Sequence, residues 1–506
     1  MLISPSYSEF QNAYERGGNQ LVWAKIIADL DTPVSAYLKV AGDKPNNFLL
    51  ESVEGGETRG RYSIIGLNPD LIFEANGNKA KINRHALTDL EDFTDVELPT
   101  LAAIEALLEE SKLDVHEDLP PMSAGIYGYL GYETIALVEE LPVPSYDELQ
   151  LPDIRLIRPT QILVIDSVKN EVTLVTPARI QEGMSAKAAY EAATLRLEET
   201  IENLNKPLLG AQNTTQITPD IKPVSKTSKQ RYLDMVYAAK NYIAAGDIFQ
   251  VVLSLRFSTP FPYAPFSLYR SLRRTNPSPY LFYLGFKDFS VVGSSPEILV
   301  KLQDEHVTIR PIAGTRKRGE NREEDEALAT ELLNDPKECA EHLMLLDLGR
   351  NDVGRVSELK SVHVTDQFFI ERYSHVMHIV SNVVGKIKKN ISAITALMAG
   401  FPAGTVSGAP KIRAMEIISE LEQSKRGVYA GCIGYFSADG SMDTCIALRT
   451  AVVKDKTLYV QAGAGIVADS VAELEYEECE NKSRALFAAA KDAHRYEEMN
   501  DKGHNG

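Results

Sequence analysis

Two pairs of glutamates, far apart in the chain, have the residue type and the spacing of a metal site. Glu338 and Glu341 lie in PKECAEHLMLLDLGRND, and Glu475 and Glu478 lie in AELEYEECENKSRA. Each pair is spaced i, i+3, so on a helix both carboxylates point the same way. Two such faces across a cleft would offer the oxygen ligands that Mg²⁺ prefers. Either pair alone is equally typical of a solvated acidic helix face.

Two glycine-rich segments are candidate anion cradles. Phe401 to Arg413 reads FPAGTVSGAPKIR, whose small residues favour a tight backbone cradle. It is not a phosphate-binding loop of the Walker type, because Lys411 is not followed by Ser or Thr. Gln461 to Val467 reads QAGAGIV and predicts a turn after a strand, with N–H groups free for a carboxylate. Both segments also suit ordinary bends of the chain.

Three further side chains could handle an anionic substrate. His378, in YSHVMHIVSNVV, belongs to the residue type whose pKa suits a base near neutrality. In a strand, His375 and His378 would face opposite sides, so only one would reach a given pocket. Arg449 interrupts an apolar run and needs a carboxylate partner, from the substrate or from the protein. Tyr429 would donate its hydroxyl or belong to the core. With the glutamates, this set favours a small polycarboxylate substrate handled with Mg²⁺.

The elements that would position these residues mix helix and strand. Apolar residues at spacings of 4, 3 and 4 from Tyr232 to Ile243 predict a helix, which Ser228 would cap and Gly246 would end. The alternating run FQVVLSLRF after it predicts a strand, as do SIIGL, LIFEA, QILVIDSV and EVTLVT in the first half.

A polar segment with three prolines divides the chain. We therefore expect an N-terminal region over residues 1–204, a linker over 205–228, a second region over 229–495 and a polar tail over 496–506.

The composition indicates a large acidic protein. The chain has 506 residues, of which 44% are hydrophobic, and this length exceeds one ordinary compact domain. Its 53 Lys and Arg against 71 Asp and Glu give a net charge of −18. Nucleic acid is therefore not an expected partner, because phosphate contacts need clustered cations.

The four cysteines indicate neither a disulfide framework nor a zinc site. The N-terminal sequence lacks the apolar core of a signal peptide. No apolar run reaches the roughly 18 residues of a membrane span. We expect a reduced, cytoplasmic protein without a membrane segment.

Seven motifs, in this order along the chain, resemble those of the chorismate-utilising enzymes: PIAGTRKRG, EHLMLLDLGRNDVGRV, VMHIVS, GTVSGAPKIRAME, GCIGYF, QAGAGIVADS and ECENK. The similarity covers the chain from about Lys229 onward and reaches the first half through LLES and RGRYSIIG. It is strongest to the large, chorismate-binding subunits of the branch that forms anthranilate. The resemblance implies an α+β fold, a layered β-sandwich of large antiparallel sheets flanked by helices. It also implies that region 229–495 is the chorismate-binding catalytic region, and that region 1–204 is regulatory and contributes to a feedback-inhibitor site.

The resemblance also implies a role for each candidate. Glu341 and Glu478 would ligate Mg²⁺, and Glu338 and Glu475 would hold its waters. Glu297, in SSPEIL, would protonate the departing ring hydroxyl. His378 would assist removal of the ring proton, and Thr405 would position the ring. The carboxylates of chorismate would be held by Tyr429, Arg449, Gly463, Ala464, Gly465 and Lys482.

Two residues favour anthranilate over the products of sister enzymes. Ala313 occupies a position where aminodeoxychorismate synthases typically carry a Lys that attacks the ring. Gln250 stands where the water-using isochorismate and salicylate synthases resemble one another in having a Lys base. Since Gln cannot deprotonate water, ammonia is the expected nucleophile.

The implied reaction is a Mg²⁺-dependent lyase step, which converts chorismate and ammonia into anthranilate and pyruvate at the first committed step of tryptophan biosynthesis. Ammonia would come from glutamine through a separate amidotransferase subunit, in a heterotetramer, because the chain shows no amidotransferase segment of its own. The alternatives are an aminodeoxychorismate synthase component or a dual-purpose subunit that also serves folate synthesis. A third is a silent tryptophan-sensing subunit, although no metal glutamate is lost.

A feedback site for tryptophan is also implied by the resemblance. LLES, at 49–52, and NPSPYL, at 276–281, are similar to the two walls of that pocket, and two prolines would make the second wall rigid. The expected inhibitor contacts are Leu50, Glu51, Ser52, Asn276, Pro277, Ser278, Tyr280 and Leu281. Leu281 replaces the Met of some relatives, an apolar change of similar volume.

Overall fold

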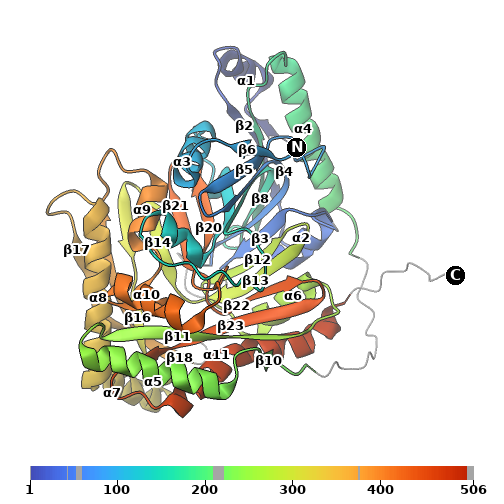
Figure 1. The fold of residues 1–506 in the computed structure, drawn as a ribbon. Helices are drawn as coiled ribbons and strands as arrows, with labels where there is room; N and C mark the ends of the chain where they lie inside the picture. The colour runs from blue at the N-terminus through green and yellow to red at the C-terminus, as the bar shows by residue number, and fades with distance from the viewer. Residues whose placement is uncertain (1, 43, 53–59, 209–220, 374–375, 498–506) are drawn as a thin grey trace.

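The computed structural model describes residues 2–42, 44–52, 60–208, 221–373 and 376–497. Its described strands all pair antiparallel and are joined in one extended sheet system of 23 strands. Helices cover the outside of these sheets, with α5, α7, α8 and α11 around the lower half and α4 along the upper half (Figure 1). The predicted α+β class with large antiparallel sheets is confirmed.

The first half contains β1 (Ile3–Ser4), α1 (Tyr7–Tyr14), β2 (Gln20–Ile27), α2 (Pro33–Val40), β3 (Asn47–Glu51), β4 (Tyr62–Asn76), β5 (Lys79–Asn83), β6 (Thr94–Val96), α3 (Thr100–Glu110), η1 (Pro121–Ser123), β7 (Gly125–Leu130), η2 (Tyr132–Leu137), β8 (Ile154–Asp166), β9 (Glu171–Ala178) and α4 (Ala186–Leu204). The long strands β4 and β8 pair over most of their length and form its centre.

The second half contains β10 (Val224–Ser225), α5 (Lys229–Ala245), β11 (Gln250–Pro260), α6 (Pro265–Thr275), β12 (Tyr280–Gly285), β13 (Phe289–Ser295), β14 (Ile298–Gln303), β15 (His306–Ile309), β16 (Ile312–Lys317), α7 (Arg322–Asn334), α8 (Pro336–Val356), β17 (His363–Arg372), β18 (Val376–Lys386), α9 (Ala393–Gly400), η3 (Gly404–Val406), β19 (Gly408–Ala409), α10 (Lys411–Glu422), β20 (Cys432–Ser437), β21 (Met442–Ile446), β22 (Thr450–Lys454), β23 (Thr457–Ile466), α11 (Ala472–Asp492) and η4 (Ala493–Tyr496).

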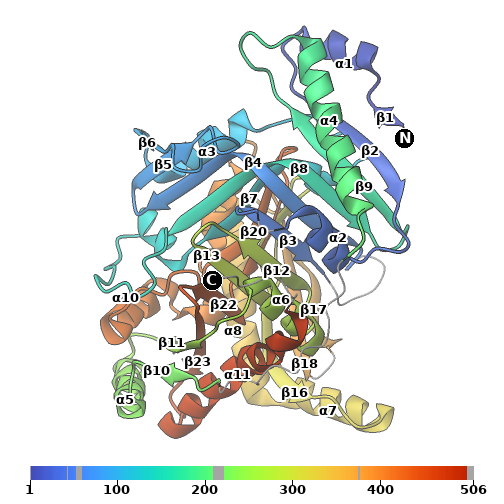
Figure 2. The same ribbon diagram turned by 90° about the vertical axis from the view of Figure 1, so that its right-hand side faces the viewer.

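The two halves share sheets. Strand β3 of the first half pairs with β12 of the second, with Glu51 opposite Leu281. Strand β7 pairs with β20, with Leu130 opposite Cys432. Figure 2 shows β3, β12, β7 and β20 close together in the middle of the molecule, where the two halves meet. Helix α4 ends at Leu204 and α5 begins at Lys229, so these helices flank the predicted linker, of which residues 209–220 lie outside the described ranges. The division into a regulatory and a catalytic region stays a prediction.

Helix α5 begins and ends where the sequence predicts. The Ser228 hydroxyl accepts a hydrogen bond from the N–H of Arg231 at 3.2 Å, which satisfies a donor of the first turn. Gly246 ends the helix at a φ of 85°, a left-handed conformation that favours glycine. The helix packs beside β11 and α11, so its buried face supports the strand that begins at Gln250.

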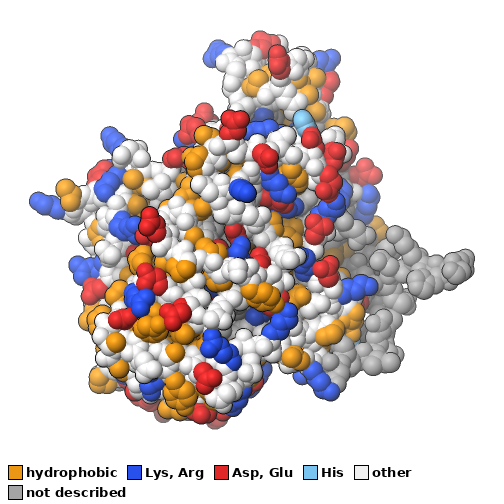
Figure 3. All heavy atoms as spheres, viewed as in Figure 1, with side chains coloured by type: hydrophobic (Ala, Val, Ile, Leu, Met, Phe, Trp, Pro, Cys, Tyr) orange, Lys and Arg blue, Asp and Glu red, His pale blue; other side chains and the backbone are white. Residues whose placement is uncertain are grey.

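No helix within the described ranges is both long and apolar enough to cross a bilayer. On the face seen in Figure 3, lysines and arginines are scattered among aspartates and glutamates. The coloured side chains of that face form no continuous basic track of the kind that follows a nucleic-acid backbone.

Candidate functional site

The predicted metal glutamates lie on two helices whose N-terminal ends are linked. Glu338 and Glu341 are in α8, and Glu475 and Glu478 are in α11, so each pair lies on one helix, where the i, i+3 spacing places both carboxylates on the same face. Lys337 of α8 forms a 2.8 Å ion pair with Asp469, just before α11. That bond raises the pKa of Lys337, and the charges of Glu341 and Glu338 add to the shift.

Each glutamate has a different environment. An oxygen of Glu341 accepts from the side-chain amide of Gln250 at 3.1 Å, and Glu338 pairs with Arg316 at 3.1 Å. Glu478 forms a 2.7 Å ion pair with Lys482. Burial raises the pKa of Glu475, and the charge of Glu478 raises it further.

The four carboxylates supply hard oxygen donors of the type that suits Mg²⁺. Lys337 interacts with the charges of both pairs. Glu338 and Glu341 raise its pKa, and its own charge acts to lower the pKa of Glu475, against the larger effect of burial. Among the described residues, however, no three acidic, histidine or cysteine side chains are close enough to hold an ion as they stand. The donor set fits the metal, and its role as a metal site stays a proposal.

The second glycine-rich segment differs from the predicted turn, because Gly463, Ala464 and Gly465 lie within strand β23. They pair with Ser254, Leu253 and Val252 of β11. The glycines are required by close neighbours: a Cβ at Gly463 would lie 2.8 Å from the Tyr429 hydroxyl, and one at Gly465 would lie 2.7 Å from the Gln250 amide. Because these two glycines have no side chain, the Tyr429 hydroxyl and the Gln250 amide can approach the backbone of the strand.

Two predicted carboxylate-binding side chains converge on this strand. The Tyr429 hydroxyl lies against Gly463, and the ammonium of Lys482 donates to the carbonyl oxygen of Gly463 at 2.9 Å. Burial raises the pKa of Tyr429, so its hydroxyl keeps its proton and can donate. The strand, the tyrosine and the lysine therefore form one polar corner beside Glu478.

Glu297 is a buried carboxyl group held by Thr405. The Thr405 hydroxyl, in η3, lies 3.2 Å from both carboxyl oxygens. The side chain of Glu297 is buried, and burial raises its pKa to about 8. The pair lines a small cavity of about 30 Å³ beside α8. A carboxyl group with such a pKa keeps its proton at neutral pH and can act as an acid.

His378 lies in β18, and one of its ring nitrogens is hydrogen-bonded to the backbone. Nδ1 is 2.9 Å from the carbonyl oxygen of Gly314, which can only accept, so Nδ1 carries the proton. Nε2 is then the acceptor nitrogen of a neutral ring. Burial lowers the pKa of His378, and the charge of Arg449 lowers it further. His375 lies outside the described residues, so the opposite-face expectation is not tested.

Arg449 links β21 to β22 in an unusual backbone conformation. Its φ is 47°, in the left-handed region that non-glycine residues rarely adopt. Its carbonyl oxygen accepts from the N–H of Ser294 at 3.2 Å, which ties the link to β13. Its charge reaches His378, so the predicted arginine and histidine lie in the same neighbourhood.

The segment Phe401 to Arg413 forms several short elements rather than a single loop. It contains η3, β19 and the start of α10, and Lys411 pairs with Asp352 of α8 at 2.8 Å. Its contribution to the site is the Thr405 side chain. Ala313 lies in β16 opposite Ile379, one residue from His378.

The two predicted inhibitor walls come together through the β3–β12 pairing. A cavity of about 120 Å³ is lined by Leu50, Glu51, Ser52, Tyr280 and Leu281 from these walls. Asn276, Pro277 and Ser278 are not among its lining residues, because Asn276 bonds to Ser294 and Ser278 to the carbonyl oxygen of Ser295. This wall therefore contributes its strand and Pro279, the residue just before the strand.

The opposite side of this cavity was not predicted from the sequence. Tyr62, Ile433, Gly434, Tyr435, Asp443 and Cys445 also line it. Three of these follow Cys432 within GCIGYF, a motif that could have been placed in the cavity had the β7–β20 pairing been known.

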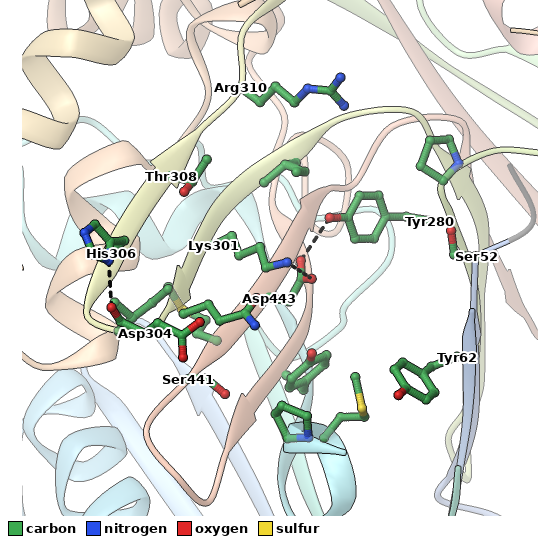
Figure 4. A pocket seen from close by; sticks show the side chains of 18 of the residues that line it. Ser52, Tyr62, Tyr280, Lys301, Asp304, His306, Thr308, Arg310, Ser441 and Asp443 are labelled. Atoms are coloured by element: carbon green, nitrogen blue, oxygen red, sulfur yellow. Dashed lines mark hydrogen bonds and ion pairs between the residues drawn. The ribbon is translucent and has the colours of Figure 1, made fainter. Parts of the chain in front are cut away.

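Asp443 is an acidic group that lines both this cavity and a larger pocket. The Tyr280 hydroxyl donates to it at 3.0 Å, and Lys301 lies 3.9 Å away. Burial raises the pKa of Asp443. Figure 4 shows these residues around a larger pocket of about 690 Å³, which shares Ser52, Tyr280 and Asp443 with the small cavity.

A family model described as chorismate binding enzyme matches residues 45–488. Component 1 of anthranilate synthase from Cereibacter sphaeroides is 54% identical over 488 residues, which cover 96% of this chain and 98% of that protein. The corresponding protein of Pseudomonas putida is 48% identical over 492 residues, covering 95% and 97% of the two chains.

Two solved structures have a similar fold. Anthranilate synthase component I from Streptococcus pneumoniae gives a TM-score of 0.74 at 38% identity, covering 91% of this chain and 98% of that one. The menaquinone-specific isochorismate synthase MenF from Escherichia coli gives 0.68 at 19% identity, covering 96% and 99%, and supports the fold alone.

Proposed function

The chain belongs to the chorismate-binding enzymes, and we propose that it converts chorismate and ammonia into anthranilate and pyruvate, the first committed step of tryptophan biosynthesis. The observation that carries this proposal is the near full-length similarity to proteins named anthranilate synthase component 1. Ala313 and Gln250 support it, because neither side chain can act as a lysine nucleophile or base.

The buried acid and the neutral imidazole have complementary tasks. Glu297 is protonated at neutral pH and donates that proton to the C4 hydroxyl of the ring, which leaves as water while ammonia adds at C2. When pyruvate leaves, Nε2 of His378 accepts the ring proton, while Nδ1 stays bonded to Gly314 and fixes the ring orientation.

The polar corner on β23 would bind the substrate carboxylates. Lys482 and the Tyr429 hydroxyl supply a charge and a donor beside Gly463. Glu341 and Glu478 would hold Mg²⁺, with Glu338 and Glu475 on its waters, and the ion would neutralise the ring carboxylate. Gln250 donates to Glu341 and so fixes the orientation of that ligand before the metal binds.

The cavity between β3, β12, β20 and β21 is the proposed tryptophan site. Its lining is mostly apolar and aromatic, and Asp443 offers a carboxylate to the ammonium of an amino acid. Glu51 is less available, because Tyr269 and Arg273 already bond to it. Feedback inhibition by the pathway product is therefore part of the proposal.

A second chain supplies the ammonia in this proposal. The relatives are named component 1, which implies a component 2, and we propose a glutamine amidotransferase in a heterotetramer. Ammonium added at alkaline pH would replace this partner, since unprotonated ammonia is the nucleophile.

The test is to incubate the purified chain with chorismate, Mg²⁺ and ammonium at alkaline pH, and to detect products by fluorescence and mass. Anthranilate that decreases when tryptophan is added supports the reaction and the inhibitor site together. Aminodeoxychorismate as the product would contradict the roles of Ala313 and Gln250. No product, from a folded chain supplemented with ammonium, would contradict the proposed reaction.

A further inference from the structure

Arg426 is a fully buried cation that joins the backbone of two site segments. Its side chain is 1% exposed. Nη1 donates to the carbonyl oxygen of Val406 at 2.7 Å, and Nη2 donates to that of Val252 at 2.7 Å. Val406 directly follows Thr405, and Val252 lies two residues after Gln250. One guanidinium group therefore fixes the distance between the segments that carry these two candidates.

The same guanidinium group also contacts Tyr429. It lies 5.6 Å from the centre of the tyrosine ring, in a cation–π arrangement. Its charge is balanced by Glu422, whose oxygens accept from Nε at 2.9 Å and from Nη2 at 2.6 Å. Glu422 additionally accepts from the N–H and the hydroxyl of Ser254, opposite Gly463. A third candidate, Tyr429, is thus held by the same group.

A side chain of the first half holds the turn from which Arg426 projects. Glu133, in η2, is 6% exposed. One of its oxygens accepts from the N–H of Arg426 at 2.7 Å, and the other accepts from the N–H of Gly427 at 3.0 Å. The N–H of Tyr132 donates to the carbonyl oxygen of Gly427 at 2.8 Å, and its ring covers the guanidinium group at 4.7 Å.

We propose that Glu133 is a positioning residue for Tyr429, acting through Arg426 from outside the half of the chain that contains the site. Two hydrogen bonds to consecutive N–H groups set the direction of the turn two residues before Tyr429. A site must be held to within fractions of an ångström for full activity, and buried bonds of fixed direction do this. The inference rests on the proposed function, since it assumes that Tyr429 binds a substrate carboxylate.

A double-mutant cycle tests the proposal. Tyr429→Phe should lower kcat/KM for chorismate about tenfold in the wild-type background, and by less than about threefold in the Glu133→Gln background. Such loss of additivity is not produced by a side chain that only supports the fold. Glu140→Gln, an exposed change in the same segment, is the matched control and should leave the tyrosine effect at its full size.

Full additivity of the two changes would overturn the proposal. If circular dichroism shows that Glu133→Gln does not fold, the same cycle is carried out with Glu133→Asp, which keeps the carboxylate on a shorter side chain. The additivity in that cycle then tests the proposal. The cycle is repeated on the Kd for chorismate by calorimetry, which needs no turnover. A wild-type chain that makes no anthranilate contradicts the proposed reaction alone, whereas additive Kd and kcat/KM effects contradict the positioning role alone.

Discussion

The buried acid Glu297 should limit activity at high pH. Its pKa is raised to about 8, so the proton is present at neutral pH and is lost as the pH rises through that value. At a constant concentration of unprotonated ammonia, kcat/KM should fall about tenfold per pH unit above about pH 8. Thr405 lowers the pKa of Glu297, so Thr405→Val should move this decline to higher pH. A profile that rises steadily over the same range would contradict the assignment.

The metal glutamates should be essential for turnover and dispensable for folding. Glu341→Gln and Glu478→Gln remove one negative charge each from the proposed ion site at nearly constant volume. We expect turnover to fall at least about 100-fold, with an unchanged circular dichroism spectrum. Glu477→Gln, an exposed change beside Glu478 on α11, is the control. Turnover like the wild type in both variants would remove the metal assignment.

At the scale of elements, strand β23 depends on its glycines. Gly463→Ala would place a Cβ 2.8 Å from the Tyr429 hydroxyl and 2.9 Å from the carbonyl oxygen of Leu253. The tyrosine must move, so we expect the KM for chorismate to rise about tenfold or more. Gly354→Ala is the matched control, because nothing lies within 4 Å of its added Cβ. A KM unchanged in the first variant would show that Tyr429 does not bind substrate from this position.

Helix signals in the sequence predicted α5, the helix that supports β11, and the shared face of each glutamate pair. The paired glutamates and the ends of α5 follow from local rules, because spacing, caps and glycine act within one element. The glycines of β23 were predicted as a turn, since the sequence does not show which neighbours leave no room for a Cβ. The left-handed Arg449 has no local signal either, because its conformation depends on contacts with β13.

The parts of the candidate sites that could not be predicted from the sequence depend on long-range contacts. The proposed inhibitor walls were identified through a resemblance, but the pairings of β3 with β12 and of β7 with β20 join residues hundreds of positions apart. The contact of Glu133 with the turn before Tyr429 is of the same kind.

At the scale of the whole molecule, inhibition and catalysis should be separable. Asp443 lines the proposed tryptophan cavity and lies outside the polar corner on β23. Asp443→Asn keeps the volume and the Tyr280 contact but removes the carboxylate offered to an ammonium group. We expect the tryptophan concentration for half inhibition to rise about tenfold or more, with kcat nearly unchanged. Asp439→Asn, an exposed change in the same hairpin, is the control. Equal sensitivity of both variants to tryptophan would place the inhibitor elsewhere.

The sharing of sheets between the two halves has a consequence for any cut in the chain. Because β3 lies on β12 and β7 lies on β20, each half would expose unpaired strand edges if it were made alone. A chain divided between Leu204 and Lys229 should therefore behave as a split protein. Its two fragments should be active only when they are co-expressed and associate.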